Sequence, residues 1–170
     1  MLSRVRPFLV LALAAVLSAC GSIDRATTRD TVAPSPGERV DATVTRVVDG
    51  DTIHVALNGG DVTIRLIGID TPETVAPGQP VECYGPQASR FTTGELTGRR
   101  IVLEFDRQLI DPFDRTLAYV WLGDEIFNET LVDEGYAEAK SYPPNTRYQA
   151  RLDAAEVAAR ASDRGMWGAC

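Results

Sequence analysis

Two segments, VVDGDTIHV (residues 47–55) and IDTPE (residues 69–73), place oxygen-bearing residues where apolar, β-branched runs turn or end. In the first, an Asp-Gly turn signal is followed by Asp51. In the second, Asp70 ends the run, and the proline after Thr71 favours an extended backbone whose carbonyl can point away from the chain. Two carboxylates and a carbonyl are ligands that suit Ca²⁺. The pattern predicts a calcium site at these three residues, with ordinary polar strand ends as the alternative.

Few residue types could act as a general base, because the sequence has one histidine, His54. This count excludes nucleases with paired histidines or a histidine–metal motif and disfavours zinc. We interpret His54 as an ordinary strand side chain. A general base must therefore be a carboxylate, and Glu73 is the best-placed candidate.

Two arginines could bind phosphate. Arg65 lies within the apolar run TIRLIGI, where a guanidinium needs an anionic partner. That partner is either a nearby acid, in a structural ion pair, or a phosphate held by both arms of the guanidinium. Arg115, just before the run TLAYVW, is a second possible phosphate ligand, although a lone loop arginine is often only solvated.

Strands and helices that would position these residues follow from the apolar pattern. Strands are predicted within residues 39–57, which contain the hairpin, and within 59–70, 99–106 and 116–123. Helices are predicted within residues 86–98, 126–136 and 145–165, the last capped by Asn145 or Thr146 and stopped by Gly165. We therefore expect an α+β, mainly β protein: a five-stranded OB-fold-like barrel with about three helices.

The spacing of Arg65 and Asp70 raises a geometric question. Five positions apart, they would point to opposite faces of a regular strand. Gly68 lies between them and could host a bulge or twist that realigns them.

The first residues predict export. Residues 1–19 have arginines, then an apolar run too short to span a bilayer, then the lipoprotein-like box LSAC ending at Cys20. We expect a lipid on Cys20, a flexible tether over residues 20–37, and a folded domain over 38–170. An ordinary signal peptide is the alternative. The chain would then be exported and lipid-anchored to the bacterial cell membrane, facing outside the cytoplasm.

Two further cysteines, Cys83 and Cys170, make an even pair suited to an oxidising compartment. We expect a disulfide between them, with two free thiols as the alternative.

The net charge is −7, and residues 38–170 carry 13 basic and 22 acidic side chains. Proteins that grip duplex nucleic acid are normally basic. Any role with nucleic acid must therefore depend on a local site.

Together, the ordered motifs VVDGDTI, IRLIGIDTPE, D..DRTLAYVW, NETLVDEGYA and AAEVAARASDRGMWG resemble the staphylococcal nuclease family over about residues 40–168. The resemblance implies an OB-fold barrel with three helices. It also implies Ca²⁺-dependent hydrolysis of DNA and RNA phosphodiesters that leaves 3′-phosphate ends.

Matched residue by residue, the resemblance implies metal binding by Asp51, Asp70 and the Thr71 carbonyl. It implies Glu73 as the base and Arg65 and Arg115 as the phosphate ligands.

Two departures from the family concern substrate binding. Phe113-Asp114 stands where the family usually has Tyr-Gly, so that Phe113 can stack but lacks a hydroxyl, and Asp114 could pair with Arg115. Tyr142 is a further stacking candidate. With the acidic composition, we expect a monomer that binds short or single-stranded DNA or RNA weakly. Two alternatives are a catalytically weak OB-fold binding module and a Ca²⁺-stabilised envelope scaffold.

Overall fold

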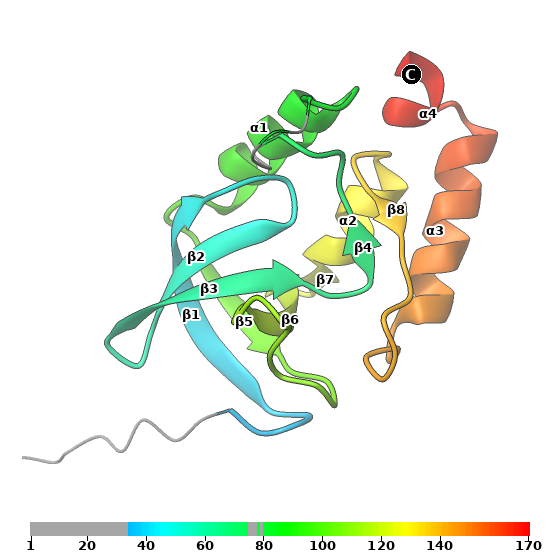
Figure 1. Cartoon of the computed structure of the whole chain (residues 1–170). Helices are drawn as coiled ribbons and strands as arrows, with labels where there is room; N and C mark the ends of the chain where they lie inside the picture. Colours follow the sequence, from blue (N-terminus) through cyan, green and yellow to red (C-terminus); the bar gives the residue numbers. More distant parts are fainter. Residues whose placement is uncertain (1–33, 75–77, 79) are drawn as a thin grey trace, which may run out of the picture. The chain divides into compact units, whose positions relative to one another are not determined.

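The computed structural model describes residues 34–74, 78 and 80–170, so that the predicted signal peptide, Cys20 and most of the tether lie outside the described residues. Five strands form a closed barrel (Figure 1). They are β1 (Arg39–Val47), β2 (Thr52–Leu57), β3 (Gly60–Leu66), β5 (Arg100–Glu104) and β6 (Thr116–Leu122). Antiparallel pairing gives the order β3-β2-β1-β5-β6, and a parallel pairing of β3 with β6 closes the barrel. The fold prediction is confirmed.

Three shorter strands extend this frame. β7 (Glu125–Ile126) pairs with β6, and β4 (Ile69–Asp70) pairs with β8 (Glu138–Ala139) in a separate two-stranded sheet. The register Asp70↔Glu138 pairs the start of the IDTPE motif with β8. This small sheet therefore joins two regions that are about seventy residues apart in the sequence.

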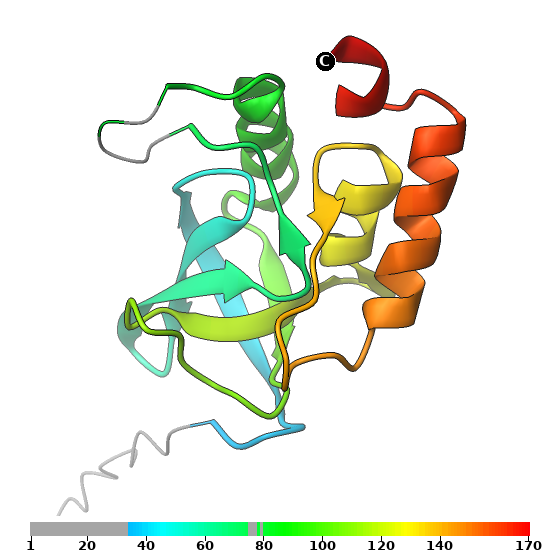
Figure 2. The same cartoon turned by 45° about the vertical axis from the view of Figure 1, so that its right-hand side comes forward.

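In the described residues, four helices accompany the barrel: α1 (Gly85–Leu96), α2 (Phe127–Asp133), α3 (Gln149–Ala161) and the one-turn α4 (Met166–Ala169). Figure 2 shows α2 and α3 side by side, with α1 above the barrel strands. The predicted helices are present, and α4 is a short addition. No helix in the described part of the chain is long and apolar enough to cross a membrane.

The core follows from strand alternation, because the buried side chains of successive strands point into the barrel. Ile53, Ile64 and Leu103 are fully buried there, with Phe127 and Leu131 of α2 packed against the same cluster. Burial on this scale supplies the main favourable term in folding.

The predicted cap of α3 is wrong. The helix begins at Gln149, with Tyr148 in the cap position and no side-chain cap hydrogen bond, and it ends at Ala161 rather than near Gly165. Asn145 instead binds the loop after β5: its Oδ1 accepts from Gln108 N at 2.7 Å, and its Nδ2 donates to Gln108 O at 2.8 Å. A side chain that could cap a helix therefore joins two loops.

Gly68 forms a turn between two strands, and this turn explains how Arg65 and Asp70, five positions apart, can face the same side. β3 ends at Leu66, and Gly68 has φ of +79°, a conformation that favours glycine. A Cβ added there would lie 2.5 Å from Leu152 Cδ1 of α3, so that the turn is also closely packed. The predicted strand therefore breaks before Ile69, and Asp70 returns to the side on which Arg65 lies.

A buried carboxylate, Glu104, ends β5 and is surrounded by donors. Arg39 donates to it at 2.6 Å, Trp121 Nε1 donates at 2.8 Å, and Arg147 forms a further ion pair. The Tyr148 hydroxyl lies 3.0 and 3.1 Å from its two oxygens. We call these five residues the Glu104 cluster.

The pKa of Glu104 reflects two opposing effects. Burial raises it, but hydrogen bonds from Arg147, Tyr148 and Arg39 outweigh burial and hold the pKa below its ordinary value of 4.5. At neutral pH the group is therefore a buried, fully paired anion.

A disulfide joins Cys83, just before α1, to Cys170 at the end of the chain, with a sequence separation of 87. On the segment before Cys83, Glu73 N donates to Glu82 Oε2 at 2.8 Å, and Glu82 N donates to Glu73 O at 2.9 Å. The C-terminus is therefore tied to the segment that carries the predicted base.

Candidate active site

One cavity of about 630 Å³ collects every residue that the sequence predicted for metal, base, phosphate and stacking roles. Its lining includes Asp51, Arg65, Asp70, Thr71, Glu73, Phe113, Arg115 and Tyr142. These residues come from the β1–β2 turn, β3, β4 and the segment that follows it, the loop before β6, and the loop before α3. Residues up to 91 positions apart are thus brought to one site.

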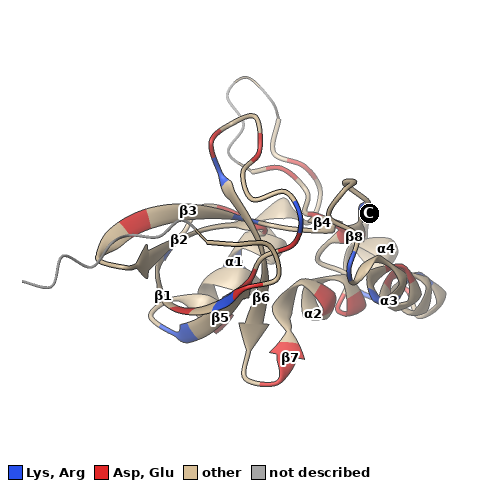
Figure 3. Ribbon diagram, turned by 90° about the horizontal axis from the view of Figure 1, so that it is seen from below, with Lys and Arg blue, Asp and Glu red and all other residues tan. Residues whose placement is uncertain are grey.

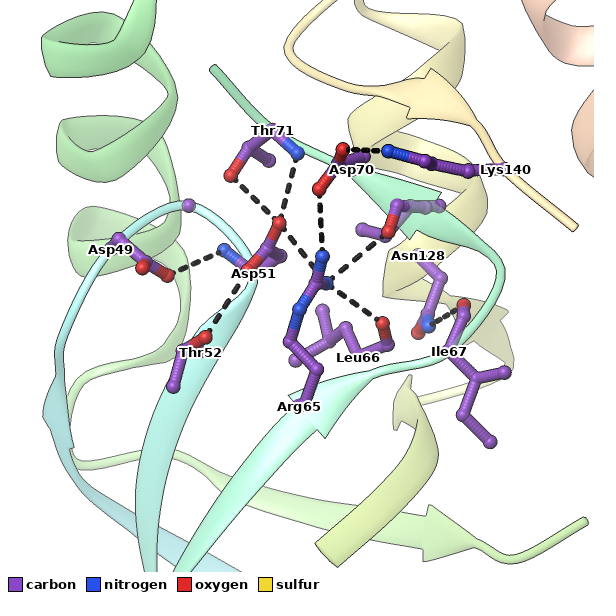
Figure 4. Close-up of polar contacts among 12 residues, drawn as sticks. Asp49, Asp51, Thr52, Arg65, Leu66, Ile67, Asp70, Thr71, Asn128 and Lys140 are labelled. Carbon is purple, nitrogen blue, oxygen red and sulfur yellow. Dashed lines mark hydrogen bonds and ion pairs between the residues drawn. The ribbon is translucent and has the colours of Figure 1, made fainter. Parts of the chain in front are cut away.

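Arg65 lies between the two predicted metal carboxylates (Figure 4). Its NH1 is 3.0 Å from Asp51 Oδ2, and its NH2 donates to Asp70 Oδ1 at 2.8 Å. NH1 also donates to the carbonyls of Leu66 and Ile69, at 3.0 and 3.2 Å. The guanidinium, whose side chain is 11% exposed, is therefore fixed by the turn at Gly68 and holds both carboxylates within the span of one fork.

Asp51 is buried and held from several directions. Its Oδ2 accepts from Thr71 N at 2.8 Å and from Thr71 Oγ1 at 2.9 Å, and its Oδ1 accepts from Thr52 Oγ1 at 3.1 Å. Gly50 is needed before it, because a Cβ there would lie 2.7 Å from the Thr71 side chain. The hairpin turn and the IDTPE segment therefore lock together around this carboxylate.

Asp70 has a second cationic partner besides Arg65. Lys140, after β8, donates from Nζ to Asp70 Oδ2 at 2.5 Å (Figure 4). This contact holds the pKa of Lys140 above its ordinary value. We call Asp51, Arg65, Asp70 and Lys140 the Arg65 cluster.

Asp49 makes the turn and also carries a perturbed carboxyl group. Burial, together with the neighbouring charge of Asp51, raises the pKa of Asp49 to about 6. Its Oδ1 accepts from Asp51 N at 3.2 Å. Burial, more than the charge of Asp51, therefore favours the neutral form of the Asp49 carboxyl.

Glu73 lines the same cavity on the segment after Pro72. Its Oε1 accepts from Thr74 N at 2.8 Å. Backbone and carboxylate contacts with Glu82 fix the segment on which it lies. The carboxylate therefore shares one solvent-accessible space with Arg65 and Arg115.

Arg115 has a partner other than the expected one. Its Nε and NH2 both contact Asp111 Oδ2 at 2.7 Å, and Asp111 Oδ1 accepts from the backbone N–H groups of Phe113 and Arg115, each at 2.9 Å. Asp114 is exposed in the left-handed region, with φ of +62°. The carboxylate that orients Arg115 is therefore Asp111, which the sequence reasoning missed although DPFDR places it four residues before the arginine.

The two stacking candidates are aromatic side chains exposed at the cavity. Phe113 is 79% exposed and Tyr142 is 43% exposed, which is unusual for large apolar side chains. Arg115 lies over the Phe113 ring at 5.4 Å, and Lys140 Nζ lies 5.7 Å from the centre of the Tyr142 ring. Each ring is thus paired with a cation and has an open face for a base or sugar.

The donor set fits a hard cation. Asp51 and Asp70 share one guanidinium, so that two carboxylates lie close together at a cavity wall, beside the predicted carbonyl ligand, Thr71. Within residues 34–74, 78 and 80–170, no group of three or more His, Cys, Asp and Glu side chains is arranged to hold a metal. Any metal here would therefore depend on two carboxylates completed by carbonyl and water oxygens.

Comparisons with known proteins agree with the fold. The family described as staphylococcal nuclease homologue matches residues 63–169. A thermonuclease of Staphylococcus intermedius is 52% identical over 124 residues, which are 73% of this chain and 74% of the relative. A thermonuclease of Staphylococcus hyicus is 51% identical over 124 residues, 73% of each chain. Endonuclease YncB of Bacillus subtilis is 40% identical over 132 residues, which are 75% of this chain and 62% of that protein. The family match and these relatives together show that the chain belongs to the staphylococcal nuclease family.

Proposed function

We propose that the chain is a Ca²⁺-dependent nuclease that hydrolyses DNA or RNA phosphodiesters and leaves 3′-phosphate ends. One observation carries the proposal: Arg65, two carboxylates, Glu73 and an oriented Arg115 share one cavity of about 630 Å³. The thermonuclease and endonuclease relatives support the same reaction class.

The metal would be held by Asp51, Asp70 and the carbonyl of Thr71. When bound, Ca²⁺ supplies Lewis-acid polarisation of a phosphate oxygen. Arg65 already lies against both carboxylates. The carboxylates that would hold the metal therefore also orient the guanidinium that would bind the phosphate.

The hydrolytic step then follows from the residues. Glu73 takes a proton from the attacking water, whose oxygen forms a bond to phosphorus while the bond to the 5′-oxygen breaks. Arg65 and Arg115 hold the equatorial oxygens and stabilise the charge that develops in the transition state. The 5′-oxygen takes a proton from solvent as it leaves, Glu73 later returns its proton to solvent, and the phosphate stays on the 3′-oxygen.

Substrate size follows from the charge pattern. Seen from below, acidic positions lie on β7 and α2, and basic positions lie on other elements (Figure 3). A duplex gains most of its affinity from a continuous basic surface. Exposed Phe113 and Tyr142 instead suit unpaired bases, so that short or single-stranded substrates are favoured.

The first test incubates the chain, with its disulfide intact, with end-labelled single-stranded DNA in Ca²⁺ or in a chelator. A Glu73→Gln variant is the matched control, because it keeps the side-chain shape and removes the base. Cleavage in Ca²⁺ that is lost in the chelator and falls by a factor of about 100 or more in the variant supports the proposal. Absence of cleavage by protein with a cooperative thermal transition would favour a binding module.

In this proposal the chain is also exported and held to the membrane by a lipid on Cys20. The signal pattern of residues 1–19 and the Cys83–Cys170 disulfide both suit an oxidising compartment. A Cys20→Ala variant should move the protein from the membrane fraction to the soluble exported fraction. Retention of that variant in the membrane fraction would contradict the lipid anchor.

A further inference from the structure

Lys140 differs from the other contacts of the Arg65 cluster in chemistry and in exposure. It is the one lysine of a sequence that has sixteen arginines. Its backbone is fixed, because Lys140 N donates to Gly68 O at 2.8 Å and β8 pairs with β4. Its side chain is 50% exposed and contacts Asp70 Oδ2 from the solvent side.

Thr71 and Arg65, which also bind the two predicted metal carboxylates, are held more firmly than Lys140. Thr71 N and Oγ1 bind Asp51 Oδ2 and so join the β1–β2 turn to the segment after β4. Arg65, 11% exposed, binds both carboxylates and the backbone carbonyls of Leu66 and Ile69. Thr71 is thus held through its backbone and Arg65 by four contacts, whereas the end of the half-exposed Lys140 side chain can move into solvent.

We propose that Lys140 is a displaceable counter-ion of the metal site. Its ammonium neutralises Asp70 while the site holds no metal, and an incoming divalent cation competes with it for Asp70 Oδ2. Lys140 therefore weakens metal binding. This inference rests on the proposed metal site and adds a residue that sets the affinity of that site.

The chemistry of lysine suits this role. An ammonium is a single point charge on a flexible stem, so that it gives up one contact at a time. A guanidinium fork such as Arg65 is held by several contacts at once and exchanges less readily. Because the ammonium and the metal carry like charge within a few ångströms, removal of the ammonium should tighten metal binding by about tenfold.

The test is a calorimetric Ca²⁺ titration of the disulfide-intact chain without nucleic acid. Lys140→Met should bind Ca²⁺ about ten times more tightly than wild type, and Lys140→Arg should stay within about threefold of wild type. Arg100→Met, at an exposed position on β5, is the charge-matched control and should stay within about twofold. Equal or weaker binding by Lys140→Met would overturn the inference.

A second readout follows the displacement itself. Reductive methylation with ¹³C-formaldehyde keeps the charge of lysine and labels Lys140 and the α-amino group. The resonance that is missing from labelled Lys140→Met belongs to Lys140, and it should shift as Ca²⁺ saturates the site. A Lys140 resonance that stays unchanged at saturation would contradict displacement.

The outcomes separate this inference from the function it rests on. If wild type and every variant fail to bind Ca²⁺, the calcium part of the proposed function is wrong and Lys140 has no metal to oppose. If all of them bind with one affinity, the metal site stands and the role of Lys140 is wrong.

Discussion

At the end of β3, Arg65 lies between two carboxylates, whereas at the end of β5 the carboxylate of Glu104 lies between two guanidinium groups. The Glu104 cluster is closed: its carboxylate side chain is 2% exposed, and its oxygens receive donors from Arg39, Trp121, Arg147 and Tyr148. The Arg65 cluster opens onto a cavity, and Asp70 in it is 37% exposed.

The two clusters differ in the ratio of anions to cations and in how accessible their carboxylates are to solvent. The enclosed carboxylate of Glu104 already accepts from several donors, so that a further ligand would add little. Its contacts hold β1, β5, β6 and the segment before α3 together. Two carboxylates that share one fixed guanidinium beside an open cavity can accept an external cation and, through it, a phosphate. Similar ion pairs thus hold segments together around Glu104 and, in the proposed function, position a metal and a phosphate around Arg65.

Arg65→Lys should have the largest effect on kcat. It tests whether the Arg65 cluster serves catalysis, unlike the Glu104 cluster. A lysine cannot bridge both carboxylates and a phosphate, so kcat should fall by a factor of about 100 to 1,000. Steady-state cleavage of single-stranded DNA in Ca²⁺ measures this loss. A variant that keeps kcat near the wild-type value would show that Arg65 is a structural ion pair like those around Glu104.

Glu104→Gln should affect stability instead of catalysis. The variant removes the buried anion that Arg39 and Arg147 bind. Because these two arginines are about half exposed, the loss is moderate, and the free energy of unfolding should fall by about 2 kcal/mol. Urea unfolding measures this change, and kcat of the folded variant should stay within about twofold. A large fall in kcat with unchanged stability would reverse the assignment of the two clusters.

The same variant gives a pH test. Because the pKa of Glu104 is lower in the folded protein than in the unfolded chain, its contribution is complete above about pH 4.5 and is lost as pH falls through the folded value. Wild-type stability should therefore fall on acidification below pH 4.5. In Glu104→Gln this part of the fall should be absent, which thermal melts between pH 3 and pH 6 would show.

Asp111→Asn should have a smaller effect, of about tenfold on kcat, because it weakens the orientation of Arg115 without removing it. Asp114→Asn is the matched control on the same turn, and its effect should be within about twofold because its side chain is not the partner of Arg115. If Asp114→Asn changes kcat more than Asp111→Asn does, the contact seen in the structure is not the one that orients the arginine.

Much of the fold follows from local pattern. Strand alternation around Ile53 and Ile64, and the Asp-Gly turn before Asp51, depend on residues close in sequence, and the barrel has the predicted strands. The α3 cap was wrong because Asn145 makes its hydrogen bonds with Gln108, 37 residues away. Capping propensity cannot foresee a loop that competes for the same side chain.

The sequence identifies most residues of the candidate site but only some of the contacts between them. The motifs identify Asp51, Asp70 and Glu73, yet the alignment of Arg65 with Asp70 required the positive φ of Gly68 and its packing on Leu152. Lys140 and Glu104 went unnoticed because the partner of Lys140 is 70 positions away and those of Glu104 are 17 to 65 positions away. Such contacts are set by strand pairing and barrel closure, which a local pattern does not contain.

The disulfide divides the molecule into a covalent ring, residues 83–170, and a linear segment before it. Asp51, Arg65 and Asp70 lie on the linear segment, whereas Arg115 and Lys140 lie within the ring. A protease cut at any single bond inside the ring leaves both pieces linked, so the two halves of the cavity stay on one molecule. A cut between Asp70 and Cys83 would instead separate the predicted metal carboxylates from the oriented arginine. In this short stretch, one cut breaks the covalent link between the segment with both predicted metal carboxylates and the ring with Arg115.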